Sequence, residues 1–186
     1  MRGPSRSGSR PPRPVPDGPA GPPPERAEAK RAGGRIVRVT LDEHTIVRRH
    51  PDIEHERAVA LYDLVEENDF RLVDGPPGPY HLHLAIIDNR LRVAVCGTDG
   101  DPLAEIVMPL VAFRRIVRDY FLVCESYYAA IRRSSPSQIE AIDMGRRALH
   151  DEGSGLLRER LADRVVMDHG TARRLFTLVC VLHLRG

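Results

Sequence analysis

The sequence predicts an α+β fold in which helices pack on one face of an antiparallel sheet. Three strand-like segments of alternating polarity, at residues 80–87, 90–96 and 103–109, follow one another with short connections. Long segments in which apolar residues recur at helical spacing come after them. Strands in a run followed by helices in a run favour an α+β arrangement over a parallel α/β sheet.

The N-terminal segment differs in composition from the rest of the chain. Residues 1–34 hold nine Pro, six Gly, seven basic and three acidic residues, so their net charge is +4. Such a segment buries too little apolar surface to offset the entropy lost on ordering, and we predict a disordered tail. We expect residues 35–186 to form a single α+β domain. That domain has slightly more acidic than basic residues, so only the tail gives a signal for nucleic acid.

The first part of the domain is predicted to contain short strands and one helix. Residues 35–42 and 45–49 are strand-like, residues 50–68 have helical spacing, and residues 70–73 form a short strand before a Pro- and Gly-rich loop. The helix is expected to start at Pro51 and to bury a stripe made of Ala58, Leu61, Tyr62 and Val65.

The hairpin at the centre of the sheet is predicted from its turn. Asp88 and Asn89 separate two alternating segments and suit a two-residue hairpin turn. The alternation then predicts that Leu82, Leu84 and Ile86 point toward the helices.

Residues 110–133 are predicted to form one long amphipathic helix that spans the domain. Its apolar stripe runs from Phe113 through Cys124 to Ile131. Ser135 is expected to cap a second helix that starts at Pro136, with Gln138 closing a capping box.

The second helix carries glycines that call for an explanation. Ala141, Gly145 and Ala148 form a stripe of small residues, which we interpret as a surface for close approach of another helix. Gly153 and Gly155 are predicted to break or kink the helix. Beyond it, residues 165–167 are expected to add an edge strand, and Asp168 or Thr171 to cap a buried helix over residues 172–184.

The composition favours a cytoplasmic protein. The N-terminal segment has no apolar core of a signal peptide, and the longest apolar run is too short to span a bilayer. Cys96, Cys124 and Cys180 are odd in number and form no C-x-x-C motif, which is typical of reduced core thiols.

Four long segments resemble a known family. The segments are PDIEHERAVALYDLVEEN, FRRIVRDYFLVCESYYAAIR, PSQIEAIDMGRRALHDEGS and TARRLFTLVCVLH. Together they are similar to an uncharacterised family of small bacterial proteins, mostly alphaproteobacterial, numbered two hundred and sixty-two among such families. The resemblance covers about residues 35–186. It implies no activity, so it transfers no catalytic residue.

Candidate chemical groups are few and each has a structural alternative. His81 and His83 share one face of a strand, but a metal site needs a third ligand, so we predict no metal and no cofactor. His150 and Glu152 lie with Asp151 and Ser154 at a helix end and are the candidate catalytic residues. The usual nucleophile, phosphate-binding and zinc motifs are missing from the sequence. We therefore commit to no catalytic residue.

Four arginines form the candidate binding site. Arg114 and Arg118 are one turn apart on the long helix, and Arg146 or Arg147 would approach them if the two helices pack together. A guanidinium cluster suits an anionic ligand or an acidic protein partner. Surface ion pairs with Asp143, Glu140 and Glu152 are the alternative.

Three functions remain open from the sequence. The first is a non-catalytic binding or regulatory module. The second is an enzyme that acts on an anionic or phosphorylated small molecule through Arg146, His150 and Glu152, and the third is nucleic-acid binding through the basic tail.

Overall fold

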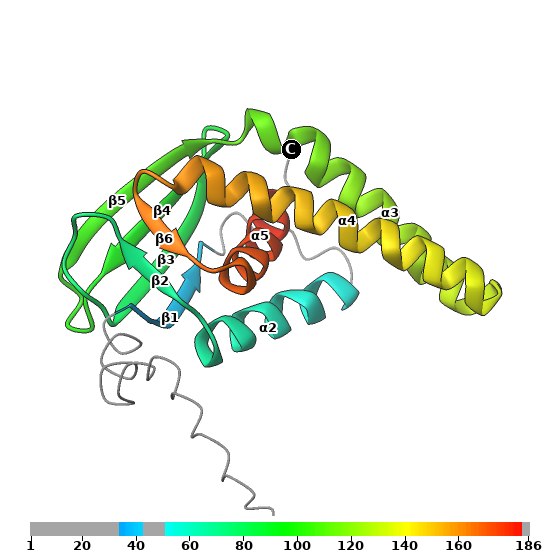
Figure 1. Ribbon diagram of the computed structural model, residues 1–186, viewed down its shortest axis with the longest axis horizontal. Coiled ribbons are helices and arrows are strands. Elements are labelled where there is room, and N and C mark those ends of the chain that lie inside the picture. Colours follow the sequence, from blue (N-terminus) through cyan, green and yellow to red (C-terminus); the bar gives the residue numbers. More distant parts are fainter. Residues whose placement is uncertain (1–33, 43–50, 184–186) are drawn as a thin grey trace, which may run out of the picture.

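The computed structural model describes residues 34–42 and 51–183, with the side chains of residues 51–53 left out. The strand predicted at residues 45–49 lies outside these ranges. The predicted tail also lies outside them, except for its last residue. The protein places a sheet at one end and helices beside it (Figure 1). None of the described helices is long and apolar enough to cross a membrane.

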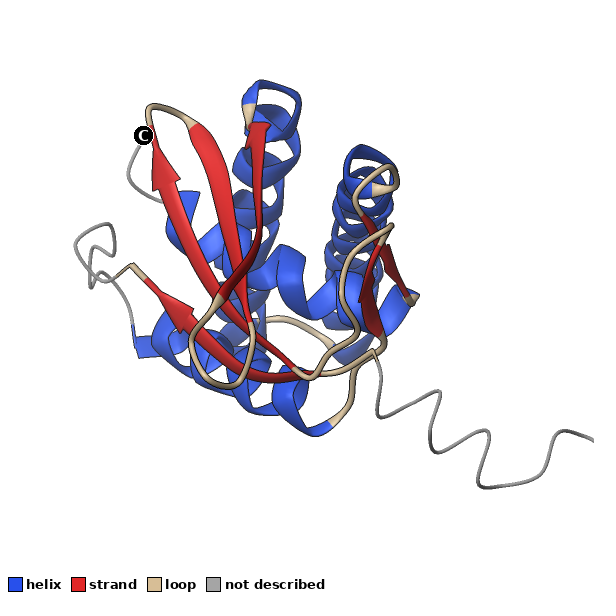
Figure 2. Ribbon diagram, turned by 90° about the vertical axis from the view of Figure 1, so that its left-hand side faces the viewer, coloured by secondary structure: helices blue, strands red, loops and turns tan. Residues whose placement is uncertain are grey.

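The larger sheet has four strands in the order β1-β3-β4-β5. These are β1 (Ile36–Leu41), β3 (Tyr80–Ile87), β4 (Arg90–Cys96) and β5 (Pro102–Pro109). Strands β3 to β5 form the predicted antiparallel meander, while β1 runs parallel to β3. The sheet is therefore mixed, and Figure 2 shows its strands beside the helices.

The turn between β3 and β4 agrees with its sequence. Asp88 and Asn89 have φ angles of 50° and 58°, which is the left-handed conformation that a two-residue hairpin turn requires. The alternation of side chains along β3 places Leu82 and Leu84 on the same face. Both are 1% exposed and belong to the core, which confirms the predicted inward face.

Helix α2 (Pro51–Glu66) forms where it was predicted but buries a partly different face. Tyr62 is 68% exposed and Ala58 is also exposed, whereas Ala60 and Leu64 are buried. Leu61 does pack against the core, so the predicted stripe was wrong at Ala58 and Tyr62 only. Apolar residues occur on more than one side of this helix, so spacing alone does not select the packed face.

Asn68 fastens the end of α2 to the edge strand. Its amide accepts a hydrogen bond from Ile36 N at 2.7 Å and donates to Ile36 O at 2.9 Å. It also donates to Leu64 O at 2.7 Å, which satisfies a carbonyl in the last turn of the helix. The Asn68 side chain therefore forms with Ile36 the pair of hydrogen bonds that a neighbouring strand would form.

The long helix is a 3₁₀ turn, η2 (Val111–Phe113), followed by α3 (Arg114–Arg133). Its stripe is buried from Phe113 to Cys124, but Ile131 is 52% exposed. The exposure arises because the far ends of α3 and α4 project beyond the rest of the molecule (Figure 1). The prediction for the stripe is thus correct only for its first part.

Helix α4 (Pro136–Leu161) is continuous, so the predicted break at Gly153 and Gly155 was wrong. A β-carbon on Gly153 would overlap the ring of Phe176, which shows that this glycine makes room for α5. A β-carbon on Gly145 would meet nothing within 4 Å, and Ala141 and Ala148 are exposed. The small-residue stripe is therefore not the close contact that was predicted.

The remaining elements complete the core. Strand β6 (Val165–Met167) pairs with β2 (Phe70–Leu72) in a separate two-stranded sheet, so it is not an edge of the larger one. Helix α5 (His169–His183) is buried along most of its length. Its first turn is capped by Asp168, whose Oδ1 accepts from Thr171 N at 2.7 Å.

Candidate functional site

A groove of about 560 Å³ lies among the four helices and is the candidate site. One wall is a face of α2, the other comes from α4 and the first half of α5, and α3 contributes one tyrosine. The lining residues are His55, Glu56, Val59, Ala60, Asp63, Tyr120, Arg146, His150, Gly170, Arg173, Arg174 and Thr177. The second cavity, lined by sheet and helix core residues, is entirely apolar and far smaller.

Glu56 connects α2 to the long helix at one end of the groove. The hydroxyl of Tyr128 donates to its Oε1 at 2.8 Å, and that of Tyr120 donates to its Oε2 at 3.4 Å. Burial, followed by the charge of Glu56, raises the pKa of Tyr120 far above its usual value. Tyr120 is therefore neutral and acts as a donor to the carboxylate.

His150 is hydrogen-bonded to its neighbour on α5. The hydroxyl of Thr177 lies 2.8 Å from His150 Nε2 and 3.3 Å from Arg173 O. A hydroxyl can donate to or accept from an imidazole nitrogen, so this contact fixes the position of the ring. Among the described residues Nδ1 has no hydrogen-bond partner, although the side chain is only 7% exposed.

The environment of His150 keeps its imidazole uncharged. The ring lies between the rings of Tyr120 and Phe176, with centroids 5.4 Å away in each case. Burial, with the nearby charges of Arg173 and Arg146, lowers the pKa of His150 to about 4. At neutral pH the residue is a neutral hydrogen-bonding group and a weak base.

Arg146 lines the groove but is bound to a carboxylate of its own helix. Its Nε and Nη2 donate to Asp143 Oδ1 at 3.0 and 2.8 Å, and its guanidinium lies 5.3 Å from the centre of the Tyr127 ring. Arg147 also contacts Asp143, at 2.6 Å. The hydrogen bond from Arg146 lowers the pKa of Asp143, so this carboxylate remains charged.

The two arginines of α5 are paired in the same way. Arg173 forms an ion pair with Asp151 of α4, which is also 3.4 Å from His169. Arg174 donates to Glu67 O at 2.8 Å and pairs with its carboxylate at 3.0 Å. These contacts hold the cationic wall of the groove in place.

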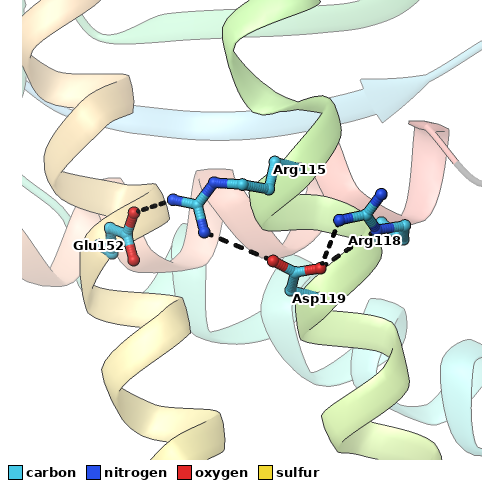
Figure 3. Close-up of polar contacts among 4 residues, drawn as sticks. All are labelled: Arg115, Arg118, Asp119 and Glu152. Carbon is cyan, nitrogen blue, oxygen red and sulfur yellow. Dashed lines mark hydrogen bonds and ion pairs between the residues drawn. The ribbon is translucent and has the colours of Figure 1, made fainter.

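The other predicted arginines lie elsewhere. Arg118 pairs with Asp119 at 3.0 Å, and Asp119 also contacts Arg115 at 3.4 Å. Arg115 in turn binds Glu152 at 2.7 Å, so α3 and α4 are joined by a chain of four charged residues on the surface (Figure 3). Because Arg118 is 69% exposed and does not line the groove, it is apart from Arg146 and His150.

The structure therefore brings together only part of the predicted site. Arg146 and His150 share the groove, whereas Arg114, Arg118, Arg147 and Glu152 do not line it. Ser154 is fully buried and its hydroxyl donates to His150 O at 2.7 Å, so it bonds to the helix backbone instead of the imidazole.

The remaining candidate groups have ordinary surroundings. His83 Nδ1 lies 2.9 Å from Thr40 Oγ1 on the outer face of the sheet. Within the described parts of the chain, no group of three His, Cys, Asp or Glu side chains could hold a metal ion. Burial, followed by the charge of Glu56, raises the pKa of Cys124 to about 11.

Several groove residues were not found from the sequence. Glu56 and Asp63 lie seven positions apart on α2, and Arg173, Arg174 and Thr177 belong to α5. The spacing of Glu56 and Asp63 was a usable signal, since residues seven apart share one helix face. Their meeting with α4 and α5 depends on the tertiary fold.

The comparison with known proteins is decisive for the family. Residues 33–185 match the family described as "Uncharacterised protein family (UPF0262)". The chain belongs to the UPF0262 family. A UPF0262 protein from Chelativorans sp. is 58% identical over 162 residues, 87% of this chain and 98% of the relative. The resemblance seen in the sequence is therefore confirmed.

Other UPF0262 proteins are similar at nearly the same level. The protein from Rhodospirillum rubrum is 55% identical over 81% of this chain and 93% of its own length. The protein from Methylobacterium radiotolerans is 52% identical over 86% of this chain and 99% of its own length. No solved structure matches the chain. The names of these UPF0262 proteins state no activity.

Proposed function

We propose that the protein is a binding module that holds a small polar molecule in the groove among α2, α3, α4 and α5 without transforming it. The observation that carries this proposal is the side chain of His150. It lines the groove, is almost fully buried, and has a ring nitrogen, Nδ1, with no partner among the described residues. A buried polar atom without a partner is costly, and a ligand that forms a hydrogen bond with it would remove that cost.

The positions of the reactive groups favour binding over catalysis. The hydroxyl of Ser154 bonds to the helix backbone and Glu152 bonds to Arg115, so neither is available to His150. Cys124 has a raised pKa, which keeps its thiol protonated and weakly nucleophilic. A nucleophile beside a base, which covalent hydrolysis requires, is thus not assembled from the residues considered.

An enzyme that acts on an anionic small molecule is the second candidate. One observation favours it, namely that Arg146 and His150 share the groove with Arg173 and Arg174. Their guanidinium groups would suit phosphate or carboxylate if they were released from Asp143, Asp151 and Glu67.

We also propose that the protein works in the cytoplasm. Cys96, Cys124 and Cys180 are all free thiols, which suits a reducing compartment. An acidic protein partner on the arginine-bearing surface, and nucleic-acid binding by the tail, remain predictions from the sequence.

Blocking the groove tests the proposal. Val59 lines the groove and is 43% exposed, so Val59→Trp fills the space while disturbing the core little. Leu122 on α3 is 55% exposed and lies outside the groove, which makes Leu122→Trp the matched control. The full chain and both variants would be screened by thermal shift and native mass spectrometry against amines, amino acids, carboxylic acids and phosphate esters.

The expected result is a ligand that stabilises the natural protein and Leu122→Trp but not Val59→Trp. The proposal is wrong if no compound binds. It is also wrong if every compound that binds stabilises Val59→Trp equally, because the binding site would then lie elsewhere. Conversion of a bound compound to a product would favour the enzyme instead.

A further inference from the structure

The two walls of the groove differ in how their charges are compensated. On the wall formed by α4 and α5, Arg146, Arg173 and Arg174 each contact a carboxylate. These three carboxylates belong to residues that do not line the groove. The positive charge of this wall is therefore largely neutralised from behind, where the ligand does not reach.

The wall formed by α2 has no such compensation from the part of the chain that the structure describes. Glu56 and Asp63 both line the groove, yet no cation forms an ion pair with either of them within residues 34–42 and 54–183. Glu56 receives two tyrosine hydroxyl bonds, which orient its carboxylate without cancelling its charge. Both side chains are half-buried, so a charge that stays unpaired there is costly.

The spacing of Glu56 and Asp63 along α2 sets the distance that a ligand bound to both carboxylates must span. Residues seven apart lie on one face of a helix and about 10 Å apart along its axis. Val59 and Ala60 occupy the same face between Glu56 and Asp63 and also line the groove. The wall therefore presents a carboxylate, an apolar surface and a second carboxylate in a row.

We propose that the ligand of this groove is a linear aliphatic dication, whose two ammonium groups bind Glu56 and Asp63 while its methylene chain packs on Val59. The inference rests on the proposed function and adds the chemical class of the ligand. An ammonium group has three donors and no acceptor, so beside Glu56 it forms charge-assisted bonds.

His150 adds a second observation. Its Nδ1 has no hydrogen-bond partner among the described residues, and the side chain is 93% buried at the groove. An amine N–H can donate to this nitrogen in its unprotonated form. The arginines of the groove are engaged with Asp143, Asp151 and Glu67, whereas Glu56 accepts from two neutral hydroxyls that leave its charge in place.

Alkyl amines of different length and charge test the inference. Titration calorimetry of the full chain at low salt would use diaminoheptane, whose nitrogens are about 10 Å apart when extended, matching the spacing of the helix positions. Diaminopropane is too short to reach both carboxylates, aminoheptane has only one ammonium group, and heptanedioate carries the opposite charge. Saturable binding of diaminoheptane is expected, with affinity about 10-fold or more above that of each of the other three.

Three matched variants locate the binding. Glu56→Gln and Asp63→Asn each remove one charge with little change of shape, and Gln at position 56 still accepts from the tyrosines. Glu66→Gln removes the same charge from α2 at an exposed position outside the groove. The first two are expected to lower the affinity for diaminoheptane about 10-fold each, and the third to leave it unchanged. Circular dichroism would verify that all three fold.

Several results would contradict the proposal that the ligand is a dication. It is wrong if diaminoheptane binds no better than aminoheptane, or if Glu66→Gln weakens binding as much as Glu56→Gln. It is also wrong if heptanedioate binds and diaminoheptane does not. In that last case, if Val59→Trp abolishes the binding of heptanedioate, the proposed groove function still holds. If no compound shows binding that Val59→Trp abolishes, both proposals are wrong.

Discussion

Gly153 of α4 lies directly against the ring of Phe176 in α5, in the space that a β-carbon would occupy. The contact joins two helices that line the groove. Gly153→Ala is therefore expected to destabilise the protein by about 2 kcal/mol or more, since the ring is buried and cannot move freely. Urea unfolding followed by circular dichroism measures the change.

Gly145 supplies the control on the same helix. A β-carbon there meets nothing within 4 Å, so Gly145→Ala should stabilise the helix by about 0.5–1 kcal/mol. Equal effects of the two substitutions would mean that Gly153 is not a packing contact.

The buried imidazole of His150 predicts a loss of stability in acid. Its pKa is about 4 in the folded protein and 6.5 as the ordinary value, so the unfolded chain takes up the proton first as pH falls. The neutral imidazole makes its full contribution to the free energy of unfolding above pH 6.5. On acidification towards pH 4, on the order of 3 kcal/mol of this free energy is lost. The charges of Arg173 and Arg146 lower the pKa in the same direction as burial does.

The difference in unfolding free energy between the natural protein and His150→Gln, measured from pH 7 to 4.5, isolates this contribution. As pH falls, the natural protein is expected to lose more unfolding free energy than His150→Gln. His55→Gln, which changes an exposed histidine of the same groove, is measured alongside as the control. A flat profile for His150→Gln would contradict the buried neutral imidazole.

Asn68 is expected to be essential for fastening α2 to β1. Asn68→Ala removes three hydrogen bonds and leaves the Ile36 backbone groups without them, so we expect a loss of about 2–4 kcal/mol. Asn89→Gly is the contrasting change, because φ is 58° there and glycine adopts that conformation easily. Thermal unfolding of both variants measures the difference, and equal melting temperatures would refute the role of Asn68.

The three cysteines should react with an alkylating reagent at different rates. Cys96 is partly exposed, whereas Cys124 and Cys180 are buried and have raised pKa values, about 11 for Cys124. Only the thiolate reacts, so Cys96 is expected to be labelled first in the native protein. Peptide mass spectrometry after timed labelling gives the order. Rapid labelling of Cys124 would contradict its burial.

Features that depend on neighbouring residues were predictable from the sequence. The turn at Asp88 and Asn89 and the start of α4 are examples, since Gln138 Oε1 does accept from Ser135 N at 3.2 Å. Features that depend on distant partners were not. The packed face of α2 is chosen by α5, and Gly153 is required by a ring that lies 23 positions further along the chain.

The candidate site shows the same limit. Arg146 and His150 were identified because their chemistry is visible in the sequence, and they do share a groove. Glu56 and Asp63 were not singled out from the sequence as candidate site residues. Their importance depends on whether cationic side chains of other helices form ion pairs with them. Those ion pairs exist only in the folded chain, so the sequence does not show them.

The most direct test of the groove is an NMR titration of the isotopically labelled full chain with diaminoheptane. The account predicts saturable amide shifts concentrated in residues 55–63, 146–150 and 170–177, which disappear in Val59→Trp and persist in Leu122→Trp. Shifts that scatter over surface carboxylates such as Glu105 and Asp163, and that persist in Val59→Trp, would contradict it.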